Sequence, residues 1–159
     1  VSSQAGGAAD APLSDTALLQ KLTGIVESFF RAYEPQMQNQ ADAVRMSIEP
    51  FTQTSDFAVV IDGRDFGTFN DWKTRSPAGI KGHYGETKSS THPISNIKFA
   101  RLGDGGAVMT VFYRTYFTET NGKKGQQDAV VTISFREENT GWKIVQYHGH
   151  HGEAVYTEN

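Results

Sequence analysis

The sequence of 159 residues contains no cysteine and no apolar run of the length that crosses a membrane. Without cysteine the chain can form no disulfide bond, no thiolate nucleophile and no cysteine-ligated zinc site. A membrane-spanning helix needs roughly 20 consecutive apolar residues. We therefore expect no membrane insertion.

Positive charge is not in excess either. The chain has 15 Lys and Arg residues against 18 Asp and Glu residues, a formal net charge of -3, and a sequence pI near 5.9. Nucleic-acid-binding domains usually carry a basic patch, so we expect no nucleic-acid partner. The G-x-S-x-G, P-loop, G-x-G-x-x-G and H-E-x-x-H motifs are also missing, which argues against serine hydrolases, nucleotide-binding proteins and zincins.

Two parts of the chain differ in composition. Residues 1–13 are rich in Ala, Gly and Ser and lack the apolar segment of an intact signal peptide, so they are typical of a flexible leader. Residues 14–159 are long enough for one domain with a substantial core. The leader slightly favours a periplasmic or secreted protein after signal cleavage, although a ragged cytoplasmic terminus explains it almost as well.

Helical patterns come first along the chain. Apolar residues at helical spacing predict a long helix over residues 14–34, and Asn39 is placed to cap a second helix that ends near Pro50. Residues 56–63 are typical of a strand that ends in an Asp-Gly turn. A brief third helix then begins near Asn70 and is limited by Pro77 and Gly79.

Strands follow, over residues 86–101, 107–120, 126–136 and 142–151, and their short links predict antiparallel neighbours and an α+β fold. Strict alternation in the last strand puts Trp142, Ile144, Gln146, His148 and His150 on one face and Lys143, Val145, Tyr147 and His151 on the other. In residues 107–120, Arg114 and Tyr116 share one face. One face of this strand should line a cavity and the other should point outward.

This order of elements resembles the nuclear transport factor 2-like superfamily, particularly its SnoaL-like branch. The matching pieces are residues 29–33, 56–67, 107–120 and 142–148. The resemblance implies a cystatin-like cone, in which N-terminal helices pack on a strongly curved antiparallel sheet that encloses a cavity. It also implies a homodimer formed through the other side of the sheet. Members of the superfamily include isomerases, cyclases, epoxide hydrolases, dehydratases, transport receptors and kinase assembly domains, so fold alone does not assign chemistry.

The resemblance implies two candidate catalytic residues. An acid at the position of Asp62 acts as a proton acceptor in isomerase-like and cyclase-like members, and apolar neighbours would raise its pKa by desolvation. The alternative is that Asp62-Gly63 is only a turn dipeptide. His148 fills the histidine position of the closing strand, where imidazole can transfer a proton. It can equally be a buried histidine with an ordinary structural partner.

Further residues are candidates for ligand binding. Gln146 stands where many relatives have a second histidine, and His150 shares its face. Arg114 with Tyr116 can clamp an anion if they point inward, or serve a dimer interface if they point outward. Trp72 either lines the cavity or belongs to the ordinary core. Two histidines on one face do not complete a zinc site, so we expect no metal and no cofactor.

The sequence therefore predicts a SnoaL-like domain that binds a small, partly apolar molecule or a small acid. One hypothesis is proton transfer of the isomerase, cyclase or dehydratase type, with Asp62 and His148 as catalytic residues. The alternative hypothesis is a non-catalytic ligand-binding or dimeric assembly module. The residues leave open whether the protein is an enzyme.

Overall fold

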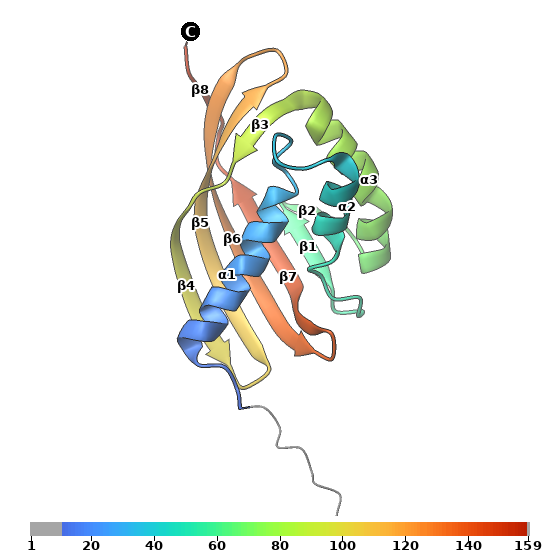
Figure 1. Cartoon of the computed structure of the whole chain (residues 1–159), viewed down its shortest axis with the longest axis vertical. Helices are drawn as coiled ribbons and strands as arrows, with labels where there is room; N and C mark the ends of the chain where they lie inside the picture. The colour runs from blue at the N-terminus through green and yellow to red at the C-terminus, as the bar shows by residue number, and fades with distance from the viewer. Residues whose placement is uncertain (1–10, 159) are drawn as a thin grey trace, which may run out of the picture.

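Three helices lie on one face of an eight-stranded sheet in the computed structural model, which describes residues 11–158 (Figure 1). The helices are α1 (Asp15–Arg31), α2 (Gln40–Ile48) and α3 (Phe69–Glu86). The strands are β1 (Ala58–Ile61), β2 (Arg64–Asp65), β3 (Thr87–Thr91), β4 (Ile94–Leu102), β5 (Gly106–Glu119), β6 (Lys124–Glu138), β7 (Gly141–His151) and β8 (Val155–Tyr156). A leader was expected for residues 1–13. Of these, residues 1–10 lie outside the described residues.

The sheet has the order β2-β1-β7-β6-β5-β3, with β4 also pairing with β5 and β8 with β6. It does not close on itself, and the helices cover one side of it (Figure 1). The α+β cone predicted from the sequence is confirmed. The sheet is mixed rather than purely antiparallel, because β1 runs parallel to β7.

The helices begin where side-chain caps were available. Ser14 accepts a hydrogen bond from the backbone N–H of Ala17 at the start of α1, and Asn39 caps α2 as predicted. The third helix is not brief, and the prediction that Pro77 and Gly79 limit it is wrong. A capping box between Thr68 and Asp71 starts α3. Burial of its apolar side continues past Pro77, and this packing stabilises a helix that lacks one backbone donor.

The edge of the sheet also differs from the expectation. Residues 86–101 form two strands instead of one, because the chain breaks at His92 and Pro93 between β3 and β4. Both strands pair with β5. The break directs His92 toward the helices, where its ring centroid lies 5.6 Å from that of Phe30.

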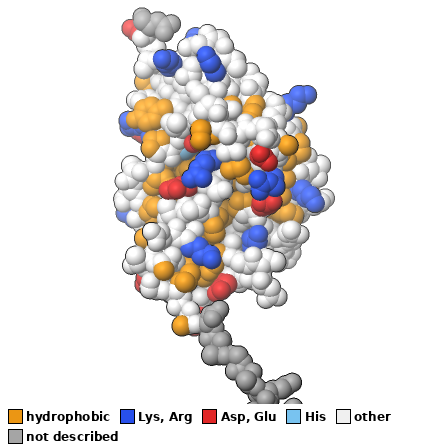
Figure 2. All heavy atoms as spheres, in the orientation of Figure 1, with side chains coloured by type: hydrophobic (Ala, Val, Ile, Leu, Met, Phe, Trp, Pro, Cys, Tyr) orange, Lys and Arg blue, Asp and Glu red, His pale blue; other side chains and the backbone are white. Residues whose placement is uncertain are grey.

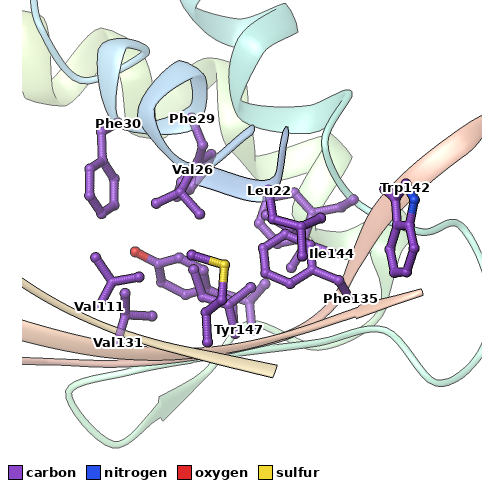
Figure 3. Packing of buried hydrophobic residues seen from close by; sticks show 14 of the residues in the cluster. Leu22, Val26, Phe29, Phe30, Val111, Val131, Phe135, Trp142, Ile144 and Tyr147 are labelled. Carbon is purple, nitrogen blue, oxygen red and sulfur yellow. The ribbon is translucent and has the colours of Figure 1, made fainter. Parts of the chain in front are cut away.

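The core lies between α1 and the inner face of the sheet (Figure 3). The apolar stripe of α1 packs there against alternate residues of β5, β6 and β7, including Val111, Val131, Ile144 and Tyr147 (Figure 3). Phe29 illustrates the packing, since its ring lies 5.3 Å from the ring centroids of both Phe51 and Tyr147, with edge-to-face geometry.

A β-bulge in β7 changes which side chains reach this core. Ser134 of β6 pairs with Gln146, but the next residue, Phe135, pairs with Ile144, so Val145 has no partner residue in β6. An extra residue reverses the alternation beyond it. As a result Ile144, Tyr147 and His151 share the inner face, while Gln146, His148 and His150 lie on the outer face. The single face predicted to run from Trp142 to His150 is therefore wrong.

No helix among residues 11–158 is both long and apolar enough to cross a membrane. On the face seen in Figure 2, positive side chains are interspersed with negative and hydrophobic ones.

Candidate functional site

A cavity of about 750 Å³ lies between the helices and the inner face of the sheet. Most of its wall is aromatic or aliphatic, contributed by α1, α3 and the strands. The aromatic part includes Phe29, Phe30, Tyr33, Phe66, Trp72 and Phe117. A cavity of this size and character is suited to a small organic molecule.

Asp62 lies beside this cavity in a tight turn. Ile61 pairs with Arg64 across the β1–β2 hairpin, and the two residues between them have positive φ angles of 52° for Asp62 and 77° for Gly63. This is the geometry of a type I′ turn, for which Asp-Gly is a preferred pair. The turn directs the Asp62 carboxylate toward the end of β7, because β1 and β7 run in parallel there.

The carboxylate of Asp62 holds His151 through two hydrogen bonds. The backbone N–H of His151 donates to Oδ1 at 2.7 Å, and its Nδ1 lies 2.9 Å from Oδ2. Partial burial alone would raise the pKa of Asp62, but these hydrogen bonds outweigh it and lower the pKa. This direction is opposite to the one expected from the apolar neighbours in the sequence. The carboxylate therefore stays ionised and fixes the imidazole.

The other nitrogen of His151 faces the cavity wall. When Nδ1–H donates to Asp62, Nε2 of the neutral ring is an acceptor. Nε2 lies 3.4 Å from the hydroxyl of Tyr113, and both residues line the cavity. Burial raises the pKa of Tyr113 to about 12, so its hydroxyl remains protonated near neutral pH. Asp62, His151 and Tyr113 thus form a chain of contacts that ends inside the cavity.

Three further polar residues of the inner wall, His92, Tyr33 and Tyr147, are uncharged near neutral pH. Burial lowers the pKa of His92 to about 4, and His92 Nδ1 lies 3.2 Å from Oε1 of Glu34. Burial also raises the pKa of Tyr33 and of Tyr147 well above the usual value. Near neutral pH these groups can bind a ligand by hydrogen bonding without adding charge.

The structure separates the residues singled out in the sequence. Trp72 lines the cavity, with its Nε1–H donating to the backbone oxygen of Ser47 at 2.9 Å. Asp62 contacts the cavity through His151. Gln146 and His148 are exposed on the outer face of β7. His150 is also exposed there, although its Nδ1 lies 3.6 Å from Oδ1 of Asp62.

Arg114 and Tyr116 also lie on the outer face of the sheet. Arg114 donates to Oδ1 of Asp128 at 2.6 Å, and Tyr116 is 45% exposed. Of the residues proposed from the sequence, the structure thus brings only Trp72 and Asp62 to the cavity, and it places the other five on the opposite face.

Sequence reasoning missed His151 and Tyr113 as site residues. Tyr113 belongs to the same alternating set as the apolar Met109 and Val111, and that set is the natural choice for the inner face. Alternation in β5 therefore carries a signal for Tyr113 as an inner-face residue. No comparable signal marked His151, because its face depends on the bulge at Val145.

A metal site does not form among residues 11–158, where no group of three or more His, Asp or Glu side chains is placed to hold an ion.

Solved structures of other proteins share this fold. A nuclear transport factor 2-like superfamily protein from Salmonella enterica serovar Typhimurium is similar with a TM-score of 0.68 and 13% identity, over 86% of this chain and 92% of that one. Hexachlorocyclohexane dehydrochlorinase LinA-type3 from Novosphingobium barchaimii has a TM-score of 0.62 and 10% identity, over 92% and 96% of the two chains. A protein proposed to be a scytalone dehydratase from Novosphingobium aromaticivorans has a TM-score of 0.66 and 13% identity, over 92% and 93%.

These similarities define the class of fold. The chain has the fold of the nuclear transport factor 2-like superfamily, as the resemblance in the sequence predicted. Within this fold, residues 73–149, from α3 into β7, match the family model described as SnoaL-like domain. A comparison with curated protein sequences finds no match.

Proposed function

We propose that this protein binds a small, partly apolar molecule in the cavity and transfers a proton to or from it, as an isomerase, cyclase or dehydratase does. The observation that carries the proposal is the line of contacts from Asp62 through His151 to Tyr113. Its two side-chain distances are 2.9 Å and 3.4 Å, and it ends at the cavity wall.

The arrangement assigns a role to each group. Nε2 of His151 accepts a proton from the substrate, and the ionised Asp62 stabilises the imidazolium that forms. The contact between Nε2 and the Tyr113 hydroxyl is long for a hydrogen bond at 3.4 Å, so a substrate C–H can replace it at little cost. The protonated Tyr113 hydroxyl then donates a hydrogen bond to the oxygen on which negative charge develops.

Two similar structures support a proton-transfer reaction. One is named as a dehydrochlorinase and the other is proposed to be a dehydratase. Both names describe eliminations, in which a base removes a proton while a group leaves. The aromatic wall of the cavity suits the apolar body that such substrates often carry.

A matched pair of histidine variants tests the proposal. The protein is incubated in D₂O with a panel of small aryl ketones and β-hydroxy ketones, and deuterium uptake and water loss are followed by NMR. For a compound that reacts, we expect His151→Gln to lower the rate by about 10² to 10⁴-fold, the usual range for a general base. His148→Gln should leave the rate unchanged, because His148 is exposed on the outer face.

The reverse result would favour the assignment made from the sequence, with His148 as the catalytic histidine. A compound that binds but shows no His151-dependent exchange or elimination would favour the alternative, a non-catalytic ligand-binding module.

A homodimer through the outer face of the sheet is a second proposal. The described helices all lie on the inner side (Figure 1), and the outer face presents the partly exposed Val108, Phe112 and Val130 beside Thr132. Uncovered apolar side chains of this kind mark interaction surfaces. Light scattering should therefore give the mass of a dimer, and Thr132→Arg should shift it toward a monomer. A monomeric wild-type protein at micromolar concentration would contradict this proposal.

A further inference from the structure

Two arginines at the cavity differ from the other arginines of the chain. Of the seven arginines in the sequence, five lie within 4.0 Å of a carboxylate, namely Arg31, Arg45, Arg101, Arg114 and Arg136. Arg64 and Arg75 form no such pair with the carboxylates of residues 11–158, and both line the cavity. The cavity wall contains no Asp or Glu side chain.

Each arginine is held at the rim by its own element. Arg64 follows the Asp62-Gly63 turn on β2, and its guanidinium carbon lies 4.7 Å above the centroid of the Phe66 ring. Stacking of this kind fixes the plane of the guanidinium group and leaves its N–H donors free at the edges. Phe66 is itself supported by Trp72, whose ring centroid is 5.4 Å away.

Arg75 approaches the same cavity from α3. It lies on the side of the helix that also presents Trp72, Ser76 and Gly79 to the cavity. The carboxylate nearest to Arg75 in the helix is that of Asp71, one turn earlier, and it accepts hydrogen bonds from the backbone and side chain of Thr68. The capping box thus engages this carboxylate, which lies near Arg75 but forms no salt bridge with it within the described residues, so the guanidinium donors of Arg75 can bind another anion.

We propose that Arg64 and Arg75 select a substrate that carries a carboxylate, bound at the rim while its apolar body fills the aromatic cavity and its reacting C–H faces His151. This inference rests on the proposed function and deepens it by naming the substrate class, a small apolar carboxylic acid. The guanidinium fork matches a planar carboxylate with two parallel hydrogen bonds.

The positions of the charged side chains fit a substrate whose carboxylate lies at the rim and whose apolar body lies inside the cavity. Both arginines are exposed, whereas Tyr113 and Tyr147 on the inner wall are buried. A carboxylate at the rim keeps part of its hydration, so it binds without the large desolvation cost of a buried ion. The inner wall around Tyr33, Tyr113 and Tyr147 offers no arginine or lysine, so burial of a carboxylate there would cost more. The charge pattern therefore orients the substrate as well as selecting it.

Binding of matched acids and amides tests this inference independently of catalysis. The probes are four pairs with the same body: cinnamate and cinnamamide, benzoate and benzamide, phenylacetate and phenylacetamide, hydrocinnamate and hydrocinnamamide. Dissociation constants are measured by NMR titration at low ionic strength. For at least one pair the acid should bind about tenfold more tightly than its amide, the difference that one charge-assisted hydrogen bond can supply.

Variants identify the groups responsible. Arg64→Gln and Arg75→Gln should each weaken binding of the acid about five- to tenfold and change binding of the amide less than about twofold. Lys73→Gln is the matched control, since Lys73 is an exposed cation on the same helix that does not line the cavity. It should leave both affinities unchanged. Added salt should weaken binding of the acid and leave binding of the amide unchanged.

Three outcomes would overturn the inference: no acid binds more tightly than its amide, the arginine variants weaken acid and amide equally, or phenyl phosphate binds about tenfold more tightly than every carboxylate. Failure of the proposed function is a separate result. It would appear as turnover that survives His151→Gln, with selective binding of acids still dependent on Arg64 and Arg75.

Discussion

The two faces of the sheet carry similar residue types in very different surroundings. On the inner face, Tyr113 and His151 contact each other beside an aromatic cavity. On the outer face, Arg114 pairs with Asp128, and His148 is exposed. Adjacent residues of one strand therefore belong to two environments, and the difference is set by the direction of each side chain.

The chemical type of a side chain alone therefore does not identify the site. A histidine is useful as a base when a carboxylate fixes its tautomer and its free nitrogen faces the substrate. His151 meets both conditions, because Asp62 binds its Nδ1 and its Nε2 faces Tyr113. His148 lies three residues earlier and meets neither condition within the described structure.

The largest expected effect is on catalysis at the inner face. Asp62→Asn keeps the size of the side chain but removes the charge that stabilises the His151 imidazolium, so the rate of proton transfer should fall by about 10² to 10⁴-fold. The rate is measured by NMR with any compound that reacts in D₂O. Asp104→Asn, in the exposed turn between β4 and β5, is the control and should retain the wild-type rate. A fully active Asp62→Asn variant would show that the charge of Asp62 does not contribute to the reaction.

The next largest effect is on stability and concerns Tyr147 and His148, two neighbouring residues of β7. Tyr147 is 4% exposed and packs against Phe29, so Tyr147→Ala should lower the free energy of unfolding by about 3 to 5 kcal/mol, as for other buried aromatic residues. His148→Ala removes a side chain that is exposed in the monomer and, with both variants made in the Thr132→Arg background to remove the proposed dimer contact, should change it by less than about 0.5 kcal/mol. Urea denaturation measures both values. Equal losses would contradict the assignment of the two faces.

The smallest effect is a dependence of stability on pH. Unfolded His92 binds a proton near pH 6.5, but in the folded protein its pKa is lowered to about 4. Between these values the unfolded state binds more protons, so stability should fall as the pH decreases, by up to about 2 kcal/mol from about pH 7.5 to about pH 5. Burial raises the pKa of Glu34, which opposes part of this loss.

Urea denaturation at the two pH values checks this prediction. His92→Gln should show a weaker dependence on pH than the wild type, and the outer-face variant His148→Gln should show the same dependence as the wild type. A wild-type protein that becomes more stable on acidification would contradict the buried, uncharged state of His92.

Several features followed from local sequence alone. The order of helices and strands, the cap at Asn39, and the turn at Asp62-Gly63 all follow from near neighbours in the chain, whose side chains act on the backbone over a few residues. The resemblance to the nuclear transport factor 2-like superfamily also came from this order. Local sequence did not predict that α3 continues past Pro77, because burial of the helix against its neighbours overrides the tendency of proline to end a helix.

The tertiary structure decided which residues form the candidate site. Strict alternation places His148 and Ile144 on one face, but the bulge at Val145, which exists only in the pairing of β7 with β6, separates them. The contact between Asp62 and His151 joins residues 89 positions apart and depends on the parallel pairing of β1 with β7. A sequence determines such contacts only through the register of whole strands, because a shift of one residue moves every later side chain to the opposite face.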